Sequence, residues 1–218
     1  MPNEKAALIL RLIDEHREEI LAFADDIRCH AEMGYREHRT AGAFAEKMRG
    51  LGLETREGLA LTGVRAALNP EKAGTATIAL LGEMDALAIP ACPSCWQETG
   101  AAHCCGHHAQ LAGVYGAAIA LSDPRIAGAL DGQVLFMGVP AEEYGELEWK
   151  KQLMREGRIA YGGGKCELLR IGAFDGVQVC VAHHTGFEGI QLGGRSGNGF
   201  VSKIMTYTGR AAHAASAP

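Results

Sequence analysis

Two apolar segments, TATIALL at 75–81 and QVLFMGV at 133–139, constrain the fold more than any other feature. Both read as buried strands, and TATIALL is apolar enough to be a central strand covered on both faces. Apolar residues recur at helical spacing from Lys5 to about Arg28, from Thr40 to Arg49 and over Gly113–Leu121. Strands that alternate with helices predict an α/β fold with a mixed, largely parallel sheet flanked by helices.

The remaining segments extend this pattern toward the C-terminus. Further strands are predicted at Glu54–Arg56, Gly63–Leu68 and Val177–Ala182, and further helices, the first of them exposed, at Leu147–Gly157 and Cys166–Ile171. After Gly186 the sequence becomes glycine-rich, and a new element is expected near Gly189. We therefore predict one domain over residues 1–188 and the beginning of a second over residues 189–218.

Charge and composition exclude several classes of protein. The net charge of −5 over 218 residues opposes binding to phosphates, so no nucleic-acid partner is expected. No apolar run approaches the ~18 residues of a membrane-spanning helix, so no membrane partner is expected either. The charged N-terminal segment lacks a cleavage-like site, which predicts a cytoplasmic protein. Its seven cysteines are then expected to be reduced and available for metal or redox chemistry.

Four polar clusters lie at or just beyond the predicted strand ends, the edge where open α/β sheets bind ligands. They are GEMDAL at 82–87, HCCGHH at 103–108, PAEE at 140–143 and the His183-His184 pair. Taken singly, each has an ordinary structural explanation: a turn cap, buried thiols with solvated histidines, a surface glutamate pair, or a strand-end histidine. Their recurrence at one edge favours a site.

The residue types in these clusters suit a metal centre. Cys105 and His107 flank a glycine and can converge on one ion, since thiolate and imidazole suit zinc and its first-row neighbours. Of two adjacent carboxylates at a strand end, one can bind a metal while the other takes a proton from water. Alternation along a strand puts His183 and His184 on opposite faces, so one of them is expected to be a ligand. Two ions held in this way indicate amide hydrolysis.

A competing hypothesis uses the pair Cys92 and Cys95. With His103, Cys104 or Cys105 these thiols could form a closed structural zinc site. Alone, as a CxxC pair, they could be a redox couple.

The order GEMDAL, CCGHH, PAEE, a strand-end histidine and GRAAHAASAP resembles the amidohydrolase branch of the aminoacylase/carboxypeptidase di-metal peptidases. The resemblance is to the side of the aminobenzoyl-glutamate hydrolases and N-acyl-amino-acid hydrolases. It implies a zinc-exopeptidase-like catalytic domain with a small α+β lid, and cleavage of the amide bond of N-acyl amino acids, amino-acid conjugates or small peptides. It also implies two divalent ions (zinc, manganese, cobalt or nickel) and a homodimer at full length.

The resemblance also implies a role for individual residues. The implied metal ligands, with His183 and His108 as alternatives, are Cys105, His107, Glu143 and His184. The implied catalytic residues are Glu142 as the general base, Asp85 as the acid that supports the site and His213 as a lid histidine that meets the substrate carbonyl. His108 departs from the family, in which a polar Asp or Asn usually follows the CGH motif.

The resemblance covers the N-terminal part of such enzymes, whose lid and last ligand histidine would follow Pro218. We therefore expect this polypeptide alone to bind metal poorly and to hydrolyse slowly or not at all. The alternative is an inactive remnant that serves as a binding or assembly module.

Overall fold

The computed structural model describes residues 2–186, 189, 203 and 205–209. The chain divides into two compact units, Met1–Thr185 and Gly186–Pro218. The first unit carries every helix and strand that the structure describes. Most of the second, including His213, lies outside the described residues, so the predicted domain boundary at 188/189 stays a prediction.

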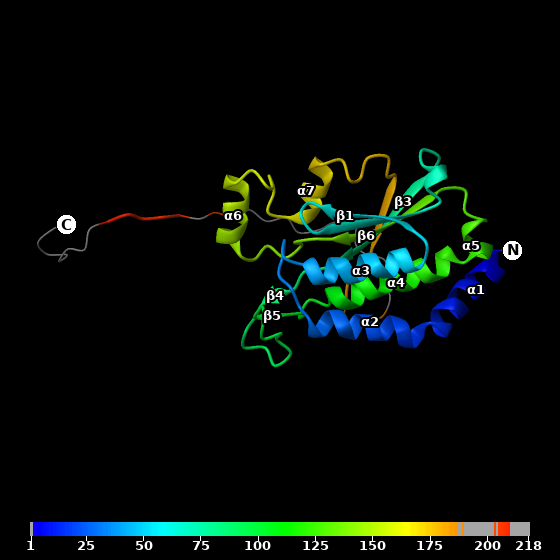
Figure 1. The fold of residues 1–218 in the computed structure, drawn as a ribbon, viewed down its shortest axis with the longest axis horizontal. Helices are drawn as coiled ribbons and strands as arrows, with labels where there is room; N and C mark the ends of the chain where they lie inside the picture. Colours follow the sequence, from blue (N-terminus) through cyan, green and yellow to red (C-terminus); the bar gives the residue numbers. More distant parts are fainter. Residues whose placement is uncertain (1, 187–188, 190–202, 204, 210–218) are drawn as a thin grey trace, which may run out of the picture. The chain divides into compact units, whose positions relative to one another are not determined.

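The first unit is built on a five-stranded sheet with the order β1-β2-β6-β3-β7 (Figure 1). In that order the strands are Glu54–Leu59, Gly63–Leu68, Gln133–Val139, Thr77–Glu83 and Val179–Ala182. Strand β3 pairs in parallel with both β6 and β7, whereas β2 pairs antiparallel with β6 and with β1. The prediction of a mixed sheet is confirmed. Strand β6 is the middle strand of this order and all seven of its residues are buried, while β3 leaves Ile78 41% exposed.

Helices cover both faces of this sheet (Figure 1). They are α1 (Pro2–Glu15), α2 (Arg17–Cys29), α3 (His38–Gly50), α4 (His107–Ser122), α5 (Pro124–Ala127), α6 (Leu147–Arg155) and α7 (Gly164–Arg170). Side chains of α2, α3 and α4 share one core with the sheet, and Leu153 of α6 and Leu168 of α7 join the core on the other side. Two short strands, β4 (Leu87–Ala88) and β5 (Ala101–Ala102), pair with each other outside the main sheet.

Two predicted helices differ from the structure. The helix expected from Lys5 to Arg28 is broken at His16, whose φ of −101° and ψ of 12° leave the helical region, so α1 and α2 are separate. The helix α6 is less exposed than its charge suggested, because Lys150 and Leu153 are buried. Within the described part of the chain, no helix is both long and apolar enough to cross a membrane.

Small residues set the approach of α4 to the sheet. A Cβ on Gly82 of β3 would lie 3.0 Å from the Cα of Leu111, so glycine lets the two backbones come close. Gly106 has a φ of +94°, a left-handed conformation that a glycine adopts without strain, and α4 begins at the next residue. The N-terminal part of α4 thereby lies close against the end of β3.

Candidate metal centre

Three strand ends and one helix start meet at a single edge of the sheet. Glu83, the last residue of β3, is in register with Val139, the last of β6, and Leu81 is in register with Ala182, the last of β7. Because these strands are parallel, the residues that follow them emerge side by side. The prediction that the polar clusters gather at strand ends is confirmed.

His107, the first residue of α4, lies at the centre of this edge with 1% of its side chain exposed. Its Nδ1 lies 2.8 Å from the main-chain oxygen of Asp85 and 3.3 Å from the Asp85 carboxylate. Its Nε2 lies 3.0 Å from the Glu83 carboxylate and 3.7 Å from Oε2 of Glu142. Asp85 holds Nδ1, so loss of the Nε2 proton leaves a lone pair there, the arrangement that orients a histidine for a metal.

Two groups of potential ligand atoms share His107. In one, Cys105, His107 and His184 place their atoms within 4.8 Å of one another; in the other, Glu83, His107 and Glu142 do so. We call these five residues the metal cluster. The Sγ of Cys105 lies 3.2 Å from Nε2 of His184.

The two strand-end histidines separate as alternation predicts. His184 belongs to the metal cluster, whereas the ring of His183 lies so close to Gly113 of α4 that a Cβ there would be 2.6 Å away. The main-chain oxygen of His183 accepts a hydrogen bond from the side-chain amide of Gln110. The structure thus brings His184, and not the alternative His183, to Cys105.

Of the PAEE carboxylates, Glu142 faces His107 and Glu143 faces Cys105. The main-chain N–H of Glu143 donates to the Asp85 carboxylate at 2.8 Å, and its main-chain oxygen accepts from Lys150. Asp85 is fully buried, and its contacts fix both the ring of His107 and the main chain of the PAEE loop.

The charges in the metal cluster are strongly coupled. Burial disfavours the charged form of His107, but the hydrogen bonds that its ring donates to the carboxylates of Asp85 and Glu83 outweigh burial and raise its pKa to about 11. Burial likewise opposes the charge of Glu83, yet His107 and Lys165 lower its pKa to about 2. Burial and the neighbouring Glu83 raise the pKa of Glu142. Burial raises the pKa of the Cys105 thiol; His107 lowers it and Glu143 raises it further.

Unsatisfied atoms show that these residues fit a metal. Nε2 of His107, Oε2 of Glu83 and Oδ1 of Asp85 are buried and have no hydrogen-bond partner of acceptable geometry among the described residues. Such atoms are costly to bury unless something binds them. Because thiolate, imidazole and carboxylate suit zinc and its first-row neighbours, a divalent cation that displaces the proton of His107 would satisfy them.

Sequence reasoning missed the residues that support the PAEE loop from a distance. The buried Glu37 accepts hydrogen bonds from the main-chain N–H of Ala141 at 2.7 Å and from the hydroxyl of Thr62 at 2.5 Å. Ala141 has a φ of +47°, which is strained for a residue with a Cβ and needs this support. Lys165 of α7, which pairs with Glu83, was also missed. No local pattern marks either residue, since their partners are far away in the sequence.

The remaining predicted ligands take other positions. His108, the alternative ligand, is in neither three-residue group, and its ring faces His103 at a centroid distance of 5.3 Å. Burial and the neighbouring His108 lower the pKa of His103 to about 3, so it is neutral. Among the described residues, Cys92 and Cys95 join no group of three or more potential ligands.

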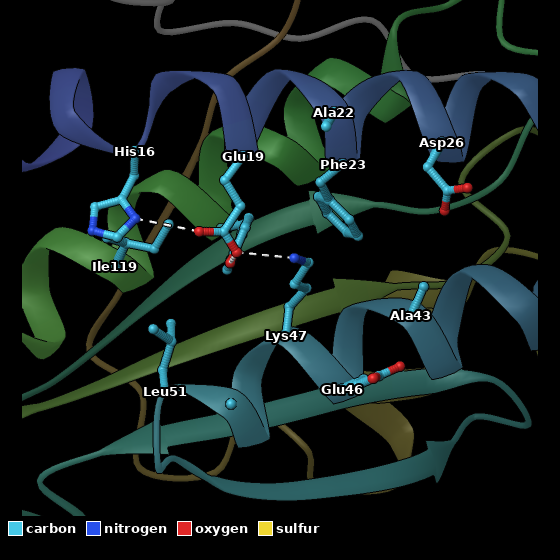
Figure 2. A pocket seen from close by; sticks show the side chains of 12 residues that line it. His16, Glu19, Ala22, Phe23, Asp26, Ala43, Glu46, Lys47, Leu51 and Ile119 are labelled. Atoms are coloured by element: carbon cyan, nitrogen blue, oxygen red, sulfur yellow. Dashed lines mark hydrogen bonds and ion pairs between the residues drawn. The ribbon is translucent and has the colours of Figure 1, made fainter.

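A cavity of about 680 Å³ lies elsewhere, among helices α2, α3 and α4 (Figure 2). We call it the helical cavity; its lining includes His16, Glu19, Phe23, Lys47 and Tyr115. The Glu19 carboxylate accepts hydrogen bonds from the Tyr115 hydroxyl and from Nζ of Lys47. None of the predicted site residues lines this cavity.

Comparison with known proteins agrees with the geometry, although no family model matches the sequence. The chain is 30% identical to thermostable carboxypeptidase 2 of Saccharolobus solfataricus over 149 residues, which are 66% of this chain and 37% of that protein. It is 27% identical to an N-acyl-L-amino acid amidohydrolase of Geobacillus stearothermophilus over 179 residues, 81% of this chain and 43% of the relative. The chain thus spans about two fifths of the length of these curated relatives.

A solved structure shares the fold. A Bacillus subtilis protein described as a dinuclear metal binding peptidase of the M20 family aligns with a TM-score of 0.56 and 26% identity. The alignment covers 80% of this chain and 42% of that protein. Sequence, fold and the order of motifs agree, and over the length that it spans the chain is similar to the aminoacylase/carboxypeptidase-like peptidases.

Proposed function

We propose that the chain supplies the metal-binding and proton-transfer part of an amidohydrolase that cleaves N-acyl amino acids, amino-acid conjugates or small peptides. The observation that carries this proposal is the meeting of Cys105, His107 and His184 within 4.8 Å, with Glu142 beside the same histidine. The relative named as an N-acyl-L-amino acid amidohydrolase supports the substrate class.

We propose Cys105, His107, His184 and Glu143 as ligands of two divalent ions, of which zinc, manganese, cobalt and nickel are the candidates. When bound, such ions polarise the scissile carbonyl and make water more acidic. Asp85 and Glu83 act on the ligands: Asp85 fixes the ring of His107 through Nδ1, and Glu83 lies against Nε2. Asp85 also fixes the main chain of Glu143.

Glu142 is the proposed general base. Its side chain is 36% exposed, so it is open to water while it faces His107. A raised pKa suits a carboxylate that takes a proton from the attacking water and returns it to the leaving amine. Lys165 lies 3.8 Å from Glu142 and offsets part of the surrounding negative charge. His213 keeps its proposed role as the lid histidine that meets the substrate carbonyl.

Location and assembly are further parts of the proposal. All seven cysteines are free, as expected for a reducing compartment, and we propose the cytoplasm. We also propose that the lid domain begins near residue 189 and that the full-length protein is a homodimer.

Metal titration tests the proposal without depending on turnover. We expect calorimetry with Zn²⁺ and Mn²⁺ to show affinity losses on the order of 100-fold for Cys105→Ser and His107→Ala. Cys95→Ser, which removes a thiol outside the metal cluster, is the matched control and should bind as the wild type does. Unchanged affinity in both ligand variants would refute the proposed centre.

Glu142→Gln in the full-length protein, with an N-acyl amino acid as substrate, tests the general base. This substitution removes the proton acceptor but keeps the shape of the side chain. Hydrolysis should fall by about 10²- to 10⁴-fold while metal affinity is retained. Metal binding with no hydrolysis of any acyl amino acid by the full-length wild-type protein would favour the binding-module alternative.

A further inference from the structure

Three of the six cysteines outside the metal cluster lie on the excursion between β4 and β5 and the segment after it. Strands β4 and β5 pair through Leu87 with Ala102 and Ala88 with Ala101, and Ile89 N–H donates to the oxygen of Gly100 at 3.0 Å. Cys92 and Cys95 lie within the excursion, and Cys104 lies two residues after β5. The sequence alone suggested a pairing of Cys92 with Cys95, because of their CxxC spacing.

The structure brings Cys92 to a different cysteine. Its Sγ lies 3.8 Å from the Sγ of Cys104, twelve residues further along the chain, and 3.2 Å from the hydroxyl of Ser94. Cys95 directs its thiol to the main-chain oxygen of its neighbour Trp96, at 3.5 Å. The two contacting thiols therefore belong to Cys92 and Cys104.

Main-chain hydrogen bonds hold both partners in place. Cys92 N–H donates to the oxygen of Ile89 at 3.0 Å, and Cys104 N–H donates to the oxygen of Ala102 at 3.0 Å. A disulfide has a sulfur–sulfur distance of about 2.05 Å, so the pair must close by about 1.8 Å, which small side-chain rotations can supply. Cys104 is exposed and Cys92 is partly exposed, so a small reagent can reach them.

We propose that Cys92 and Cys104 form a reversible disulfide, a modification site distinct from the metal cluster, and that low-molecular-weight disulfides of the glutathione type are its oxidants. One thiolate attacks the oxidant, forms a mixed disulfide and releases one thiol of the reagent. The second thiolate then attacks the mixed disulfide, closes the protein bridge and releases the other reagent thiol. Two protein thiols are thus oxidised and one reagent disulfide is reduced to two thiols.

The bridge would act next to the metal cluster without using one of its ligands. Cys104 directly precedes Cys105, so closing the bridge ties the segment that carries Cys105 to the β4–β5 excursion. Cys105 itself keeps its thiol and its contact with His184.

Peptide mapping by mass spectrometry tests the proposal on the folded 218-residue chain treated with oxidised glutathione. We expect one internal bridge, between Cys92 and Cys104, with release of two reduced glutathione molecules per bridge formed. Cys95→Ser is the matched control and should form the same bridge. Cys92→Ser and Cys104→Ser should stop at a mixed disulfide on the remaining partner.

Because the wild-type map needs no variant, the test does not depend on whether a substituted chain folds. A bridge between Cys92 and Cys95 in the wild type would overturn the proposal. So would a glutathione adduct that persists on Cys92 or Cys104, or a Cys92–Cys104 bridge that forms only after denaturation.

Discussion

The metal cluster and the helical cavity contain similar side chains, but they differ in whether the buried polar atoms of these side chains have hydrogen-bond partners. In the helical cavity, hydrogen bonds from the Tyr115 hydroxyl and from Lys47 lower the pKa of Glu19 to about 2. Figure 2 shows Lys47 directed at the Glu19 carboxylate. In the metal cluster the pKa of Glu83 is also about 2, but there burial is the largest influence that the hydrogen bonds must overcome, and Oε2 stays without a partner. Both regions thus hold an ionised glutamate near a lysine and a histidine.

The difference teaches which region is built for a ligand. None of the polar side chains that line the helical cavity is among the buried atoms without a hydrogen-bond partner in the described structure. Such atoms occur on Glu83 and His107 of the metal cluster and on Asp85 beside it. Hollow space alone therefore does not identify the site, whereas buried unsatisfied atoms that lie among several potential metal ligands do.

The largest expected effect that sharpens this comparison comes from Asp85→Ala. The substitution removes the acceptor for the Glu143 N–H and the carboxylate beside His107, so we expect unfolding to become easier by about 3–5 kcal/mol. Asp26→Ala, at the partly exposed carboxylate beside the helical cavity, should cost less than about 1 kcal/mol. Urea denaturation of the metal-free proteins measures both. Equal losses in the free energy of unfolding would show that the carboxylates of the two regions contribute equally to stability.

The next effect is a dependence of the free energy of unfolding on pH, which arises beside the metal cluster. Burial and the neighbouring Asp85 raise the pKa of Glu37 to about 7, so folding favours its protonated form. Its stabilising contribution is complete below about pH 4.5 and is lost as the pH rises through 7, a change of about 3 kcal/mol.

Glu37→Gln tests this linkage. The amide mimics the neutral acid, since it can accept from Ala141 while the Thr62 hydroxyl turns to accept from it. Urea denaturation between pH 5 and pH 8 should show a flatter stability profile for the variant than for the wild type. Parallel profiles would mean that Glu37 does not titrate in this range.

Metal affinity provides a third, smaller contrast between two matched substitutions. Glu83→Gln replaces the carboxylate that lies 3.0 Å from His107 by a neutral amide, so we expect a loss of about 10- to 100-fold in affinity for Zn²⁺. Glu19→Gln makes the same chemical change in the helical cavity and should leave affinity unchanged. Calorimetric titration decides, and a comparable loss in both variants would contradict a local role for Glu83.

The smallest expected effect lies in the helical cavity itself. Tyr115→Phe removes one hydroxyl that donates to Glu19 but keeps the ring that packs edge-on against Phe23. We expect a loss of about 1 kcal/mol in the free energy of unfolding. Thermal denaturation measures this change, and metal affinity should not move. A loss of metal affinity would mean that the two regions are coupled.

Much of the fold is predictable because apolar runs determine it. Strands Gly63–Leu68 and Gln133–Val139 have the predicted limits, because residues typical of turns flank each apolar run in the sequence. The gathering of Asp85, Cys105, His107, Glu142 and His184 follows from parallel strand ends and needs no knowledge of distant contacts.

What could not be predicted depends on contacts between distant parts of the chain. Glu37 meets Ala141 across 104 residues, and Lys165 meets Glu83 across 82. The CxxC spacing suggested a partner for Cys92 by proximity in sequence, whereas main-chain turns set the actual contact with Cys104. The break at His16 has no glycine or proline to signal it.

The two edges of the described sheet differ in how well they resist association. Strand β1 carries the charged residues Glu54, Arg56 and Glu57, which discourage pairing with a foreign strand. Strand β7 has the sequence VCVA without a charge, and Val179 and Val181 are each 50% exposed. We therefore expect concentrated solutions to self-associate through β7, and Val181→Lys should lower their light scattering while a charge added to β1 should not.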